Sequence, residues 1–311
     1  MIDKQTTLIL GAGASAPFGF PTGYELLRRV IDWADVNPGQ TNPSLFPEFD
    51  KTQINEFREA LEKSSKKSVD SFLEHRPEFI TIGKRAMAMA LIQCEHQPHL
   101  FKRDGKSWYE YLFNHLNAKF EDFGQNQLSI LTFNYDRSLE HFLFTALKNS
   151  YGKSDEECAE KLKSIAIIHL HGDLGELPHF GNTLVRPYNT DITQATLRIA
   201  TERIKIVHES AAIEPQFEQA RHILSASETI CFLGFGYDPV NLERLGIRNR
   251  IPNLRGKHIL GSSFDLTFAE ANQASEQCGI NLRPGHHDYR PWDVLHFLRE
   301  SGALHGKRFL S

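Results

Sequence analysis

The 311-residue sequence predicts an α/β fold, in which helices cover both faces of a parallel sheet. Three observations predict it. Short apolar runs recur along the chain, several of them end at glycine or at polar residues, and segments with helical spacing of apolar residues separate them. This alternation is typical of Rossmann-like folds. We therefore expect a single domain over residues 1–311, with a helical insertion at about 36–124 that interrupts the alternation.

Five segments carry the strand pattern. The predicted strands lie in "TTLIL" (6–10), "QLSILTFNYD" (127–136), "SIAIIHLHGD" (164–173), "ETICFLGFGYDP" (228–239) and "KHILGSS" (257–263). The predicted helices of the alternation are "GYELLRRVIDWA", "RSLEHFLFTAL", "EPQFEQARHILSAS" and "LTFAEANQASEQ", with one more starting near Pro239. The insertion opens with a Pro-rich piece and continues with four helical patterns. In one of them, "SVDSFLE" (68–74), Ser68 or Asp70 is the expected cap.

The composition excludes several classes of protein. The net charge is −4 and the pI about 6.4, so we expect no broad nucleic-acid surface. The four cysteines form no CxxC pair, which argues against a structural zinc site. No apolar run approaches the roughly 20 residues that span a bilayer, and the chain starts directly in a strand-like segment. We expect neither a membrane span nor a signal peptide, and a cytoplasmic location with free thiols.

The chemistry-bearing residues collect at the predicted strand ends. Parallel sheets bind ligands outside the carboxyl ends of their strands. In the first loop, Gly11, Ala12 and Gly13 would let the backbone approach a pyrophosphate, and Ser15 adds a hydroxyl. The third glycine of a GxGxxG motif is replaced by Ala16, and no ribose-binding acid follows about twenty positions on. A tight strand-to-helix turn is therefore the alternative interpretation.

The loop after the fourth predicted strand repeats this geometry. Gly234 and Gly236 alternate around Phe235, and Tyr237 is placed to stack on a ring or to cover the site. Packing of two glycines against the fold is the alternative. Gly261, in "GSS", is a weaker copy of the same pattern. All five residues are candidate nucleotide contacts.

"TFNYD" and "HLHGD" supply the polar side chains. Asn134 and Asp136 follow Thr132, are two apart and are expected on one side, where an amide and a carboxylate suit ribose hydroxyls, a carboxamide or a held water. For Asp136, a helix cap is the alternative. His169 and His171 are expected on one face of their strand. They could bind a metal, but no further ligands have convincing spacing. Otherwise one is a general base and the other a packed histidine.

Together these motifs resemble the sirtuin superfamily. Sirtuins carry a GAGxS loop, a TQNxD segment and a catalytic His-Gly, which "GAGAS", "TFNYD" and His171-Gly172 match in the same order. Phe133 replaces the glutamine, and both the zinc-binding CxxC pairs and the PDFR-type segment of the protein deacylases are missing. These departures resemble the sirtuin-like NAD hydrolases of bacterial antiphage defence.

The resemblance implies an NAD+ glycohydrolase that depletes NAD+ and needs no metal. Asn134 would position the ribose and an attacking water, and His171 would assist at a ribose hydroxyl, giving nicotinamide and ADP-ribose. Uncontrolled depletion of NAD+ would kill the host cell, so the activity must be inhibited until it is triggered. We therefore expect a homo-oligomer whose activity is released by assembly, by a second protein subunit or by a phage-derived trigger, with the insertion as the contact. The alternatives are a non-catalytic NAD or ADP-ribose sensor, a protein deacylase and, with least support, a Rossmann dehydrogenase.

Overall fold

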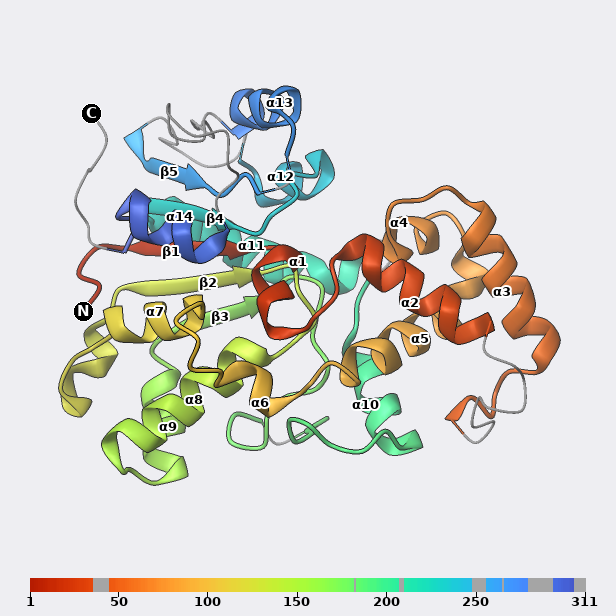
Figure 1. Ribbon diagram of the computed structural model, residues 1–311, viewed down its shortest axis with the longest axis horizontal. Coiled ribbons are helices and arrows are strands. Elements are labelled where there is room, and N and C mark those ends of the chain that lie inside the picture. Colours follow the sequence, from red (N-terminus) through yellow and green to blue (C-terminus); the bar gives the residue numbers. More distant parts are fainter. Residues whose placement is uncertain are drawn as a thin grey trace.

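The computed structural model describes residues 1–35, 45–181, 183–206, 210–247, 256–264, 266–278 and 293–304. Over these residues the chain forms an α/β fold around a five-stranded parallel sheet of order β3-β2-β1-β4-β5 (Figure 1). The strands are β1 (Thr6–Leu10), β2 (Leu128–Thr132), β3 (Ala166–His169), β4 (Thr229–Leu233) and β5 (His258–Gly261). The predicted fold class and all five predicted strands are confirmed. Part of the Pro-rich opening of the insertion lies outside the described residues.

The central strand β1 places the two halves of the chain side by side. It pairs with β2 on one side, where Leu10 lies opposite Thr132, and with β4 on the other, where Leu10 lies opposite Leu233. The strand order runs outward from β1 to β3 and then restarts at β4, so the loops after β1 and β4 flank the point where the order reverses. Open α/β sheets bind ligands at such a point.

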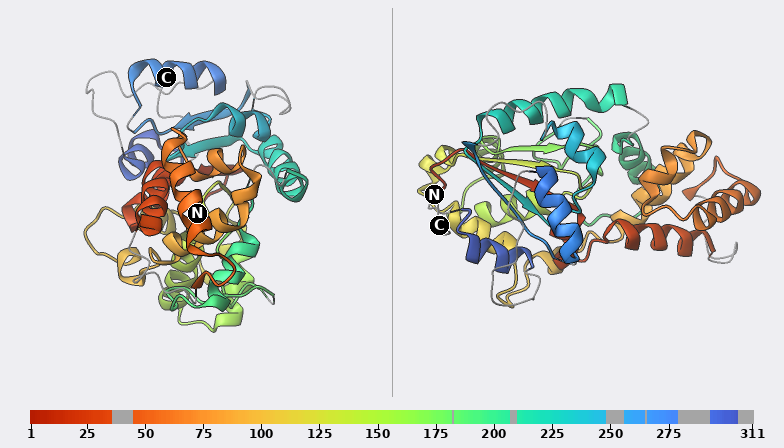
Figure 2. Two further views of the ribbon diagram at one scale, coloured as in Figure 1. Left: turned by 90° about the vertical axis from the view of Figure 1, so that its right-hand side faces the viewer. Right: turned by 90° about the horizontal axis from the view of Figure 1, so that it is seen from above.

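Helices cover both faces of the sheet (Figure 2). The helices are α1 (Ala12–Ser15), α2 (Gly23–Asp35), α3 (Lys51–Lys63), α4 (Val69–Leu73), α5 (Ile80–Ile92), α6 (Gln97–Leu100), α7 (Trp108–His115), α8 (Ser138–Tyr151), α9 (Asp155–Leu162), α10 (Gln194–Arg203), α11 (Ser210–Ala226), α12 (Pro239–Leu245), α13 (Phe268–Cys278) and α14 (Val294–Ser301). Successive side chains of a strand point to opposite faces, so Ile9 packs with residues of α11, α12 and α13, whereas Leu8 and Leu10 pack with α7, α8 and α14.

A helical lobe lies beside the carboxyl ends of the strands (Figure 1). It consists of α2, α3, α4, α5 and α10, so it combines part of the predicted insertion with the helix before it and with α10, which follows β3. Its buried residues belong to the same apolar cluster as one face of the sheet. Helix α3 is capped by Asp50 and α4 by Ser68, each in a reciprocal capping box. Ser68 is therefore the cap of α4, and Asp70 is not.

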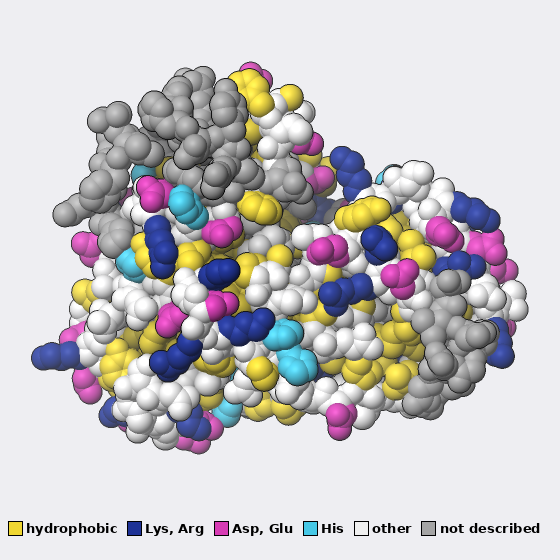
Figure 3. All heavy atoms as spheres, in the orientation of Figure 1, with side chains coloured by type: hydrophobic (Ala, Val, Ile, Leu, Met, Phe, Trp, Pro, Cys, Tyr) yellow, Lys and Arg dark blue, Asp and Glu magenta, His cyan; other side chains and the backbone are white. Residues whose placement is uncertain are grey.

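The segment between β1 and α2, predicted as a glycine-rich turn, contains helical structure. Gly11 is extended and α1 begins directly after it, followed by a 3-10 turn (Ala16–Phe18) that ends at Gly19, whose φ is +93°. Helices α6, α9, α10 and α14 were not predicted. Among the described residues no helix is long and apolar enough to cross a membrane. On the face seen in Figure 3, Lys and Arg side chains are interspersed with Asp and Glu.

Candidate functional site

A cavity of about 220 Å³ opens between the carboxyl edge of the sheet and the helical lobe. The loops after β1, β2 and β4 form one wall, and residues of α2, α4 and α5 form the other. Seven of the predicted site residues line it: Gly11, Ala12, Ser15, Asn134, Asp136, Phe235 and Gly236. The sequence-predicted residues thus meet in one space, although they come from three separate loops.

The amide of Asn134 is held in one orientation. Its Nδ2 donates to the carbonyl oxygen of Gly11 and to Oγ of Ser15, each at 3.0 Å, and its backbone N–H donates to Oγ1 of Thr132 at 3.0 Å. A carbonyl oxygen can only accept, so the NH₂ group must face Gly11. The Oδ1 atom has no hydrogen bond from a described residue, so it is the group that Asn134 can offer to the cavity.

Asp136 both lines the cavity and holds the start of α8. Its Oδ1 accepts from the backbone N–H of Ser138 at 3.1 Å and also from the Ser138 hydroxyl. Burial raises the pKa of Asp136, while hydrogen bonds from Ser138 and Ser15 oppose that rise. The N-cap of α8 is Arg137 and not Asp136, but Asp136 accepts from the first N–H of the helix in addition to lining the cavity. Asn134 and Asp136 share Ser15 as a neighbour, in agreement with the predicted common side.

The glycines of the first loop are packed against the loop after β4. The N–H of Gly13 donates to the carbonyl of Gly234 at 3.0 Å, and a Cβ on Gly11 would lie 2.6 Å from the same oxygen. Gly234 itself has a φ of +56°, and a Cβ there would lie 2.1 Å from the backbone nitrogen of Ala14. The backbone atoms that approach these glycines therefore belong to two loops of the same chain. Gly13 and Gly234 do not line the cavity: Gly13 lies in α1, at the tight strand-to-helix turn after β1, and the packing alternative describes Gly234 but not Gly236, which lines the cavity.

Three further residues that were predicted to contact a nucleotide lie outside the cavity and pack near its loops. The Gly234 N–H donates to Oγ of Ser262 at 2.8 Å, and the hydroxyl of Tyr237 donates to the Ser262 carbonyl at 2.9 Å. Tyr237 is buried among aromatic rings, and Gly261 lies opposite Phe232 at the end of β5. Thr132 lies beneath Asn134. Tyr237, Gly261 and Thr132 therefore lie outside the cavity lining, and their roles as nucleotide contacts remain predictions.

His169 and His171 do not share a face, and that expectation is wrong. Strand β3 ends at His169, and the chain turns at Gly172, whose φ is +76°. His169 contacts the carbonyl of Asn134 at 2.8 Å and Glu140 at 2.5 Å, whereas His171 packs edge-on against Phe133. Among the described residues no group of three or more His, Cys, Asp or Glu is arranged to hold a metal.

His171 is closed off from the cavity. It does not line it, its Nε2 is buried without a hydrogen-bond partner, and the ring of Phe133 contacts both His171 and Phe235. Burial, with a contribution from Arg244, lowers the pKa of His171 to about 4, so the ring is neutral at pH 7. The glycine after it is required by the chain, because a Cβ on Gly172 would lie 1.9 Å from the Arg203 carbonyl.

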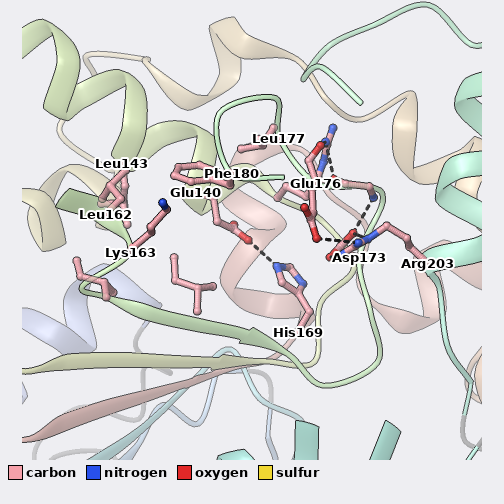
Figure 4. A pocket seen from close by; sticks show the side chains of 14 residues that line it. Glu140, Leu143, Leu162, Lys163, His169, Asp173, Glu176, Leu177, Phe180 and Arg203 are labelled. Carbon is pink, nitrogen blue, oxygen red and sulfur yellow. Dashed lines mark hydrogen bonds and ion pairs between the residues drawn. The ribbon is translucent and has the colours of Figure 1, made fainter. Parts of the chain in front are cut away.

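His169 is a buried imidazolium beside a second cavity of about 280 Å³ (Figure 4). Both of its nitrogens face acceptors, so both carry a proton. Burial lowers the pKa of His169, but the charge and hydrogen bond of Glu140, with smaller contributions from Asp173 and the Asn134 carbonyl, outweigh it and raise the pKa to about 9. In the same cavity Asp173 binds Arg203 at 2.6 Å. The charged side chains of this cavity named above, His169, Glu140, Asp173 and Arg203, are therefore already in ion pairs with one another.

This raised pKa predicts a pH-dependent stability. Because the folded pKa of His169 lies above its ordinary value of 6.5, its stabilisation is fully present below about pH 6.5 and is lost as the pH rises through about 9. We expect the difference in free energy of unfolding between wild type and His169→Gln to shrink by about 3 kcal/mol between pH 6 and pH 10. Urea unfolding at both pH values measures it. A constant difference would contradict the charged state.

The cavity also contains residues that the sequence did not single out as site residues. They are Phe20, Pro21, Thr22, Gly23, Leu26, Asp70, Leu91, Phe133, Tyr135, Asp238 and Asn241. For Asp70 the sequence suggests only the role of a helix cap. Neither the protein-family models nor the curated proteins searched match this chain, so the α/β fold and the geometry of the site are what is established.

Proposed function

We propose that the protein is an NAD+ glycohydrolase that cleaves NAD+ to nicotinamide and ADP-ribose. The observation that carries this proposal is the held amide of Asn134. Its Nδ2 is fixed by Gly11 and Ser15 inside a cavity at the carboxyl edge of the sheet, which leaves Oδ1 as an acceptor for a water or a ribose hydroxyl. The resemblance of "GAGAS", "TFNYD" and His171-Gly172 to sirtuin-like NAD hydrolases supports the same chemistry.

Cleavage of the nicotinamide–ribose bond depends more on the correct placement of the substrate and the attacking water than on a strong acid or base. Breaking the bond between C1′ of the ribose and the nicotinamide nitrogen passes through an oxocarbenium-like transition state, for which orientation and a held nucleophile contribute most. A cavity of about 220 Å³ lies below the usual range for whole ligands and suits a nucleoside-sized part of a dinucleotide. In this proposal the nicotinamide riboside half occupies the cavity, and NAD+ is the substrate.

His171 enters the proposal conditionally. A neutral imidazole can accept a proton from a ribose hydroxyl. The Phe133 ring must move before His171 can reach the cavity, and the unpartnered Nε2 is consistent with a resting conformation. This supports the further proposal that NAD+ depletion is released by assembly of a homo-oligomer, by a second subunit or by a phage-derived trigger in antiphage defence. The helical lobe beside the cavity is the contact we propose for it.

A non-catalytic sensor of NAD+ or ADP-ribose is the second candidate. One observation favours it: His171 lies outside the cavity that contains Asn134. A sensor needs the cavity and the held amide to bind ligand, but it does not need the imidazole to reach a ribose.

Nicotinamide release from NAD+ tests the proposal. We expect Asn134→Ala to reduce the rate about a hundredfold, because the acceptor is removed, and His171→Ala to reduce it about tenfold or more. Asn149→Ala and His75→Ala are matched controls, because both side chains are exposed, and we expect wild-type rates from both. Release that persists unchanged in Asn134→Ala would contradict the proposal. NAD+ binding without release, with or without candidate partners, would favour the sensor.

A further inference from the structure

Helix α4 of the lobe presents an acidic side chain to the cavity. Val69, Phe72 and Leu73 of this helix are buried in the apolar core, and Ser68 caps its start. With these residues anchored, Asp70 is directed to the space that Asn134 also lines. The packing of α4 fixes the position of the helix, and a hydrogen bond from Tyr135 holds the carboxyl group itself.

Asp70 has unused capacity to accept hydrogen bonds. The hydroxyl of Tyr135 donates to its Oδ1, and no lysine or arginine of the described residues forms an ion pair with it. An ionised carboxyl group has two oxygens and about four acceptor sites. The phenol of Tyr135 and the backbone N–H of Asp70 itself use part of this capacity and leave the rest for a ligand.

The other two carboxyl groups of the cavity are already engaged. Asp136 binds Ser138 at the start of α8, and Asp238 accepts from the backbone N–H groups of Val240 and Asn241 at the start of α12. Asp70 differs from both because it caps nothing. Of the carboxyl groups that line this cavity, it is the one that accepts no backbone N–H of another residue at the start of a helix in the described chain, and its side-chain partner is the Tyr135 hydroxyl.

We propose that Asp70 contacts the substrate and takes the proton of the attacking water, an inference that rests on the proposed hydrolysis. In that step the water oxygen forms a bond to C1′, and the bond from C1′ to the nicotinamide nitrogen breaks. The electron pair of the broken bond goes to the pyridinium nitrogen, which gives neutral nicotinamide. The water's proton passes to the Asp70 carboxylate and then to solvent.

The environment of Asp70 makes this role sensitive to pH. Burial raises the pKa of Asp70, the Tyr135 hydrogen bond lowers it and Glu74 raises it. The other titratable groups that line the cavity are Asp136 and Asp238. On the helices packed against α4, Glu25 of α2 binds Thr22, Arg29 of α2 binds Cys94, and Arg85 of α5 binds Glu48. A protonated Asp70 cannot accept a proton, so the rate should rise with pH through this pKa.

The test measures nicotinamide release between pH 4 and pH 9. We expect Asp70→Asn to lower kcat about a hundredfold and to remove the rise with pH. Tyr135→Phe should move the rise to higher pH, because the hydrogen bond that lowers the pKa of Asp70 is lost. Glu62→Gln, an exposed carboxyl on α3, is the control and should match wild type. Wild-type kcat in Asp70→Asn would overturn the role of Asp70 while leaving the hydrolase proposal intact.

A binding measurement separates Asp70 from the hydrolysis itself. ADP-ribose carries on C1′ the hydroxyl that the attacking water becomes, and NAD+ does not. We expect Asp70→Asn to weaken ADP-ribose binding about tenfold or more in calorimetry, with a smaller effect on NAD+. If wild type releases no nicotinamide but this selective loss is found, the hydrolysis fails and the contact stands. Equal ADP-ribose affinity in wild type and variant, or no binding by wild type, would overturn the contact.

Discussion

Glu95→Gln is expected to lower the free energy of unfolding by about 3–5 kcal/mol, as measured by urea or guanidinium unfolding. Glu95 is fully buried and accepts from Nη2 of Arg137 at 2.7 Å and from Nη1 and Nη2 of Arg186 at 2.7 and 2.6 Å. Both arginines are buried as well. Removing the one carboxylate leaves two guanidinium charges without a counter-charge, and it directs an amide N–H toward donors.

A matched variant separates burial from the loss of charge. Glu48 binds Arg85 at 3.0 Å, but its side chain is 56% exposed, so Glu48→Gln should cost less than about 1 kcal/mol. Equal small costs for both variants would contradict the assignment of Glu95 as the centre of a buried ionic cluster. The cluster also matters for the site. Arg137 directly follows Asp136 and binds the Gly175 carbonyl at 2.7 Å, so the loss should also disturb the cavity wall.

The parts of the fold that were predictable have a local cause. Short continuous runs of β-branched and apolar residues specify buried strands such as β1 and β4 wherever they stand in the chain. Their carboxyl ends then meet at one edge, which is why Asn134, Asp136 and Ser15 could be grouped from sequence alone. Helix α1 was not predicted, because its start depends on the extended conformation of Gly11 against the loop after β4.

The residues that sequence reasoning missed depend on contacts between distant segments. Asp70 reaches the cavity because α4 packs on α2 and α5, and no periodicity fixes where a helical lobe lies against a sheet. The expectation that His169 and His171 share one face requires the strand to continue through His171. Strand β3 ends at His169, two residues earlier. The alternation of residue types in a sequence does not predict the end of a strand to within two residues. The partners of Glu95 are Arg137 and Arg186, which lie on segments far from it in the sequence. No sequence motif predicts that these segments contact one another.

The two glycines after β4 are expected to respond differently to alanine. Gly234→Ala would place Cβ 2.1 Å from the backbone nitrogen of Ala14 and 2.3 Å from the carbonyl carbon of Gly13, at a φ of +56°. Neither neighbour is the end of a flexible side chain, so the backbone must shift. We expect a loss of at least about 3 kcal/mol in the free energy of unfolding, measured by denaturant titration.

Gly236→Ala is the matched substitution in the same loop. A Cβ at Gly236 meets nothing within 4 Å, and its φ lies outside the left-handed region, so stability should change by less than about 1 kcal/mol. Because Gly236 lines the cavity, the added methyl should still weaken binding of NAD+ or ADP-ribose. Intact stability with weakened binding would make this loop part of the ligand site. Equal stability of the two variants would contradict the close packing of the loops after β1 and β4, and that packing positions the carbonyl that holds Asn134.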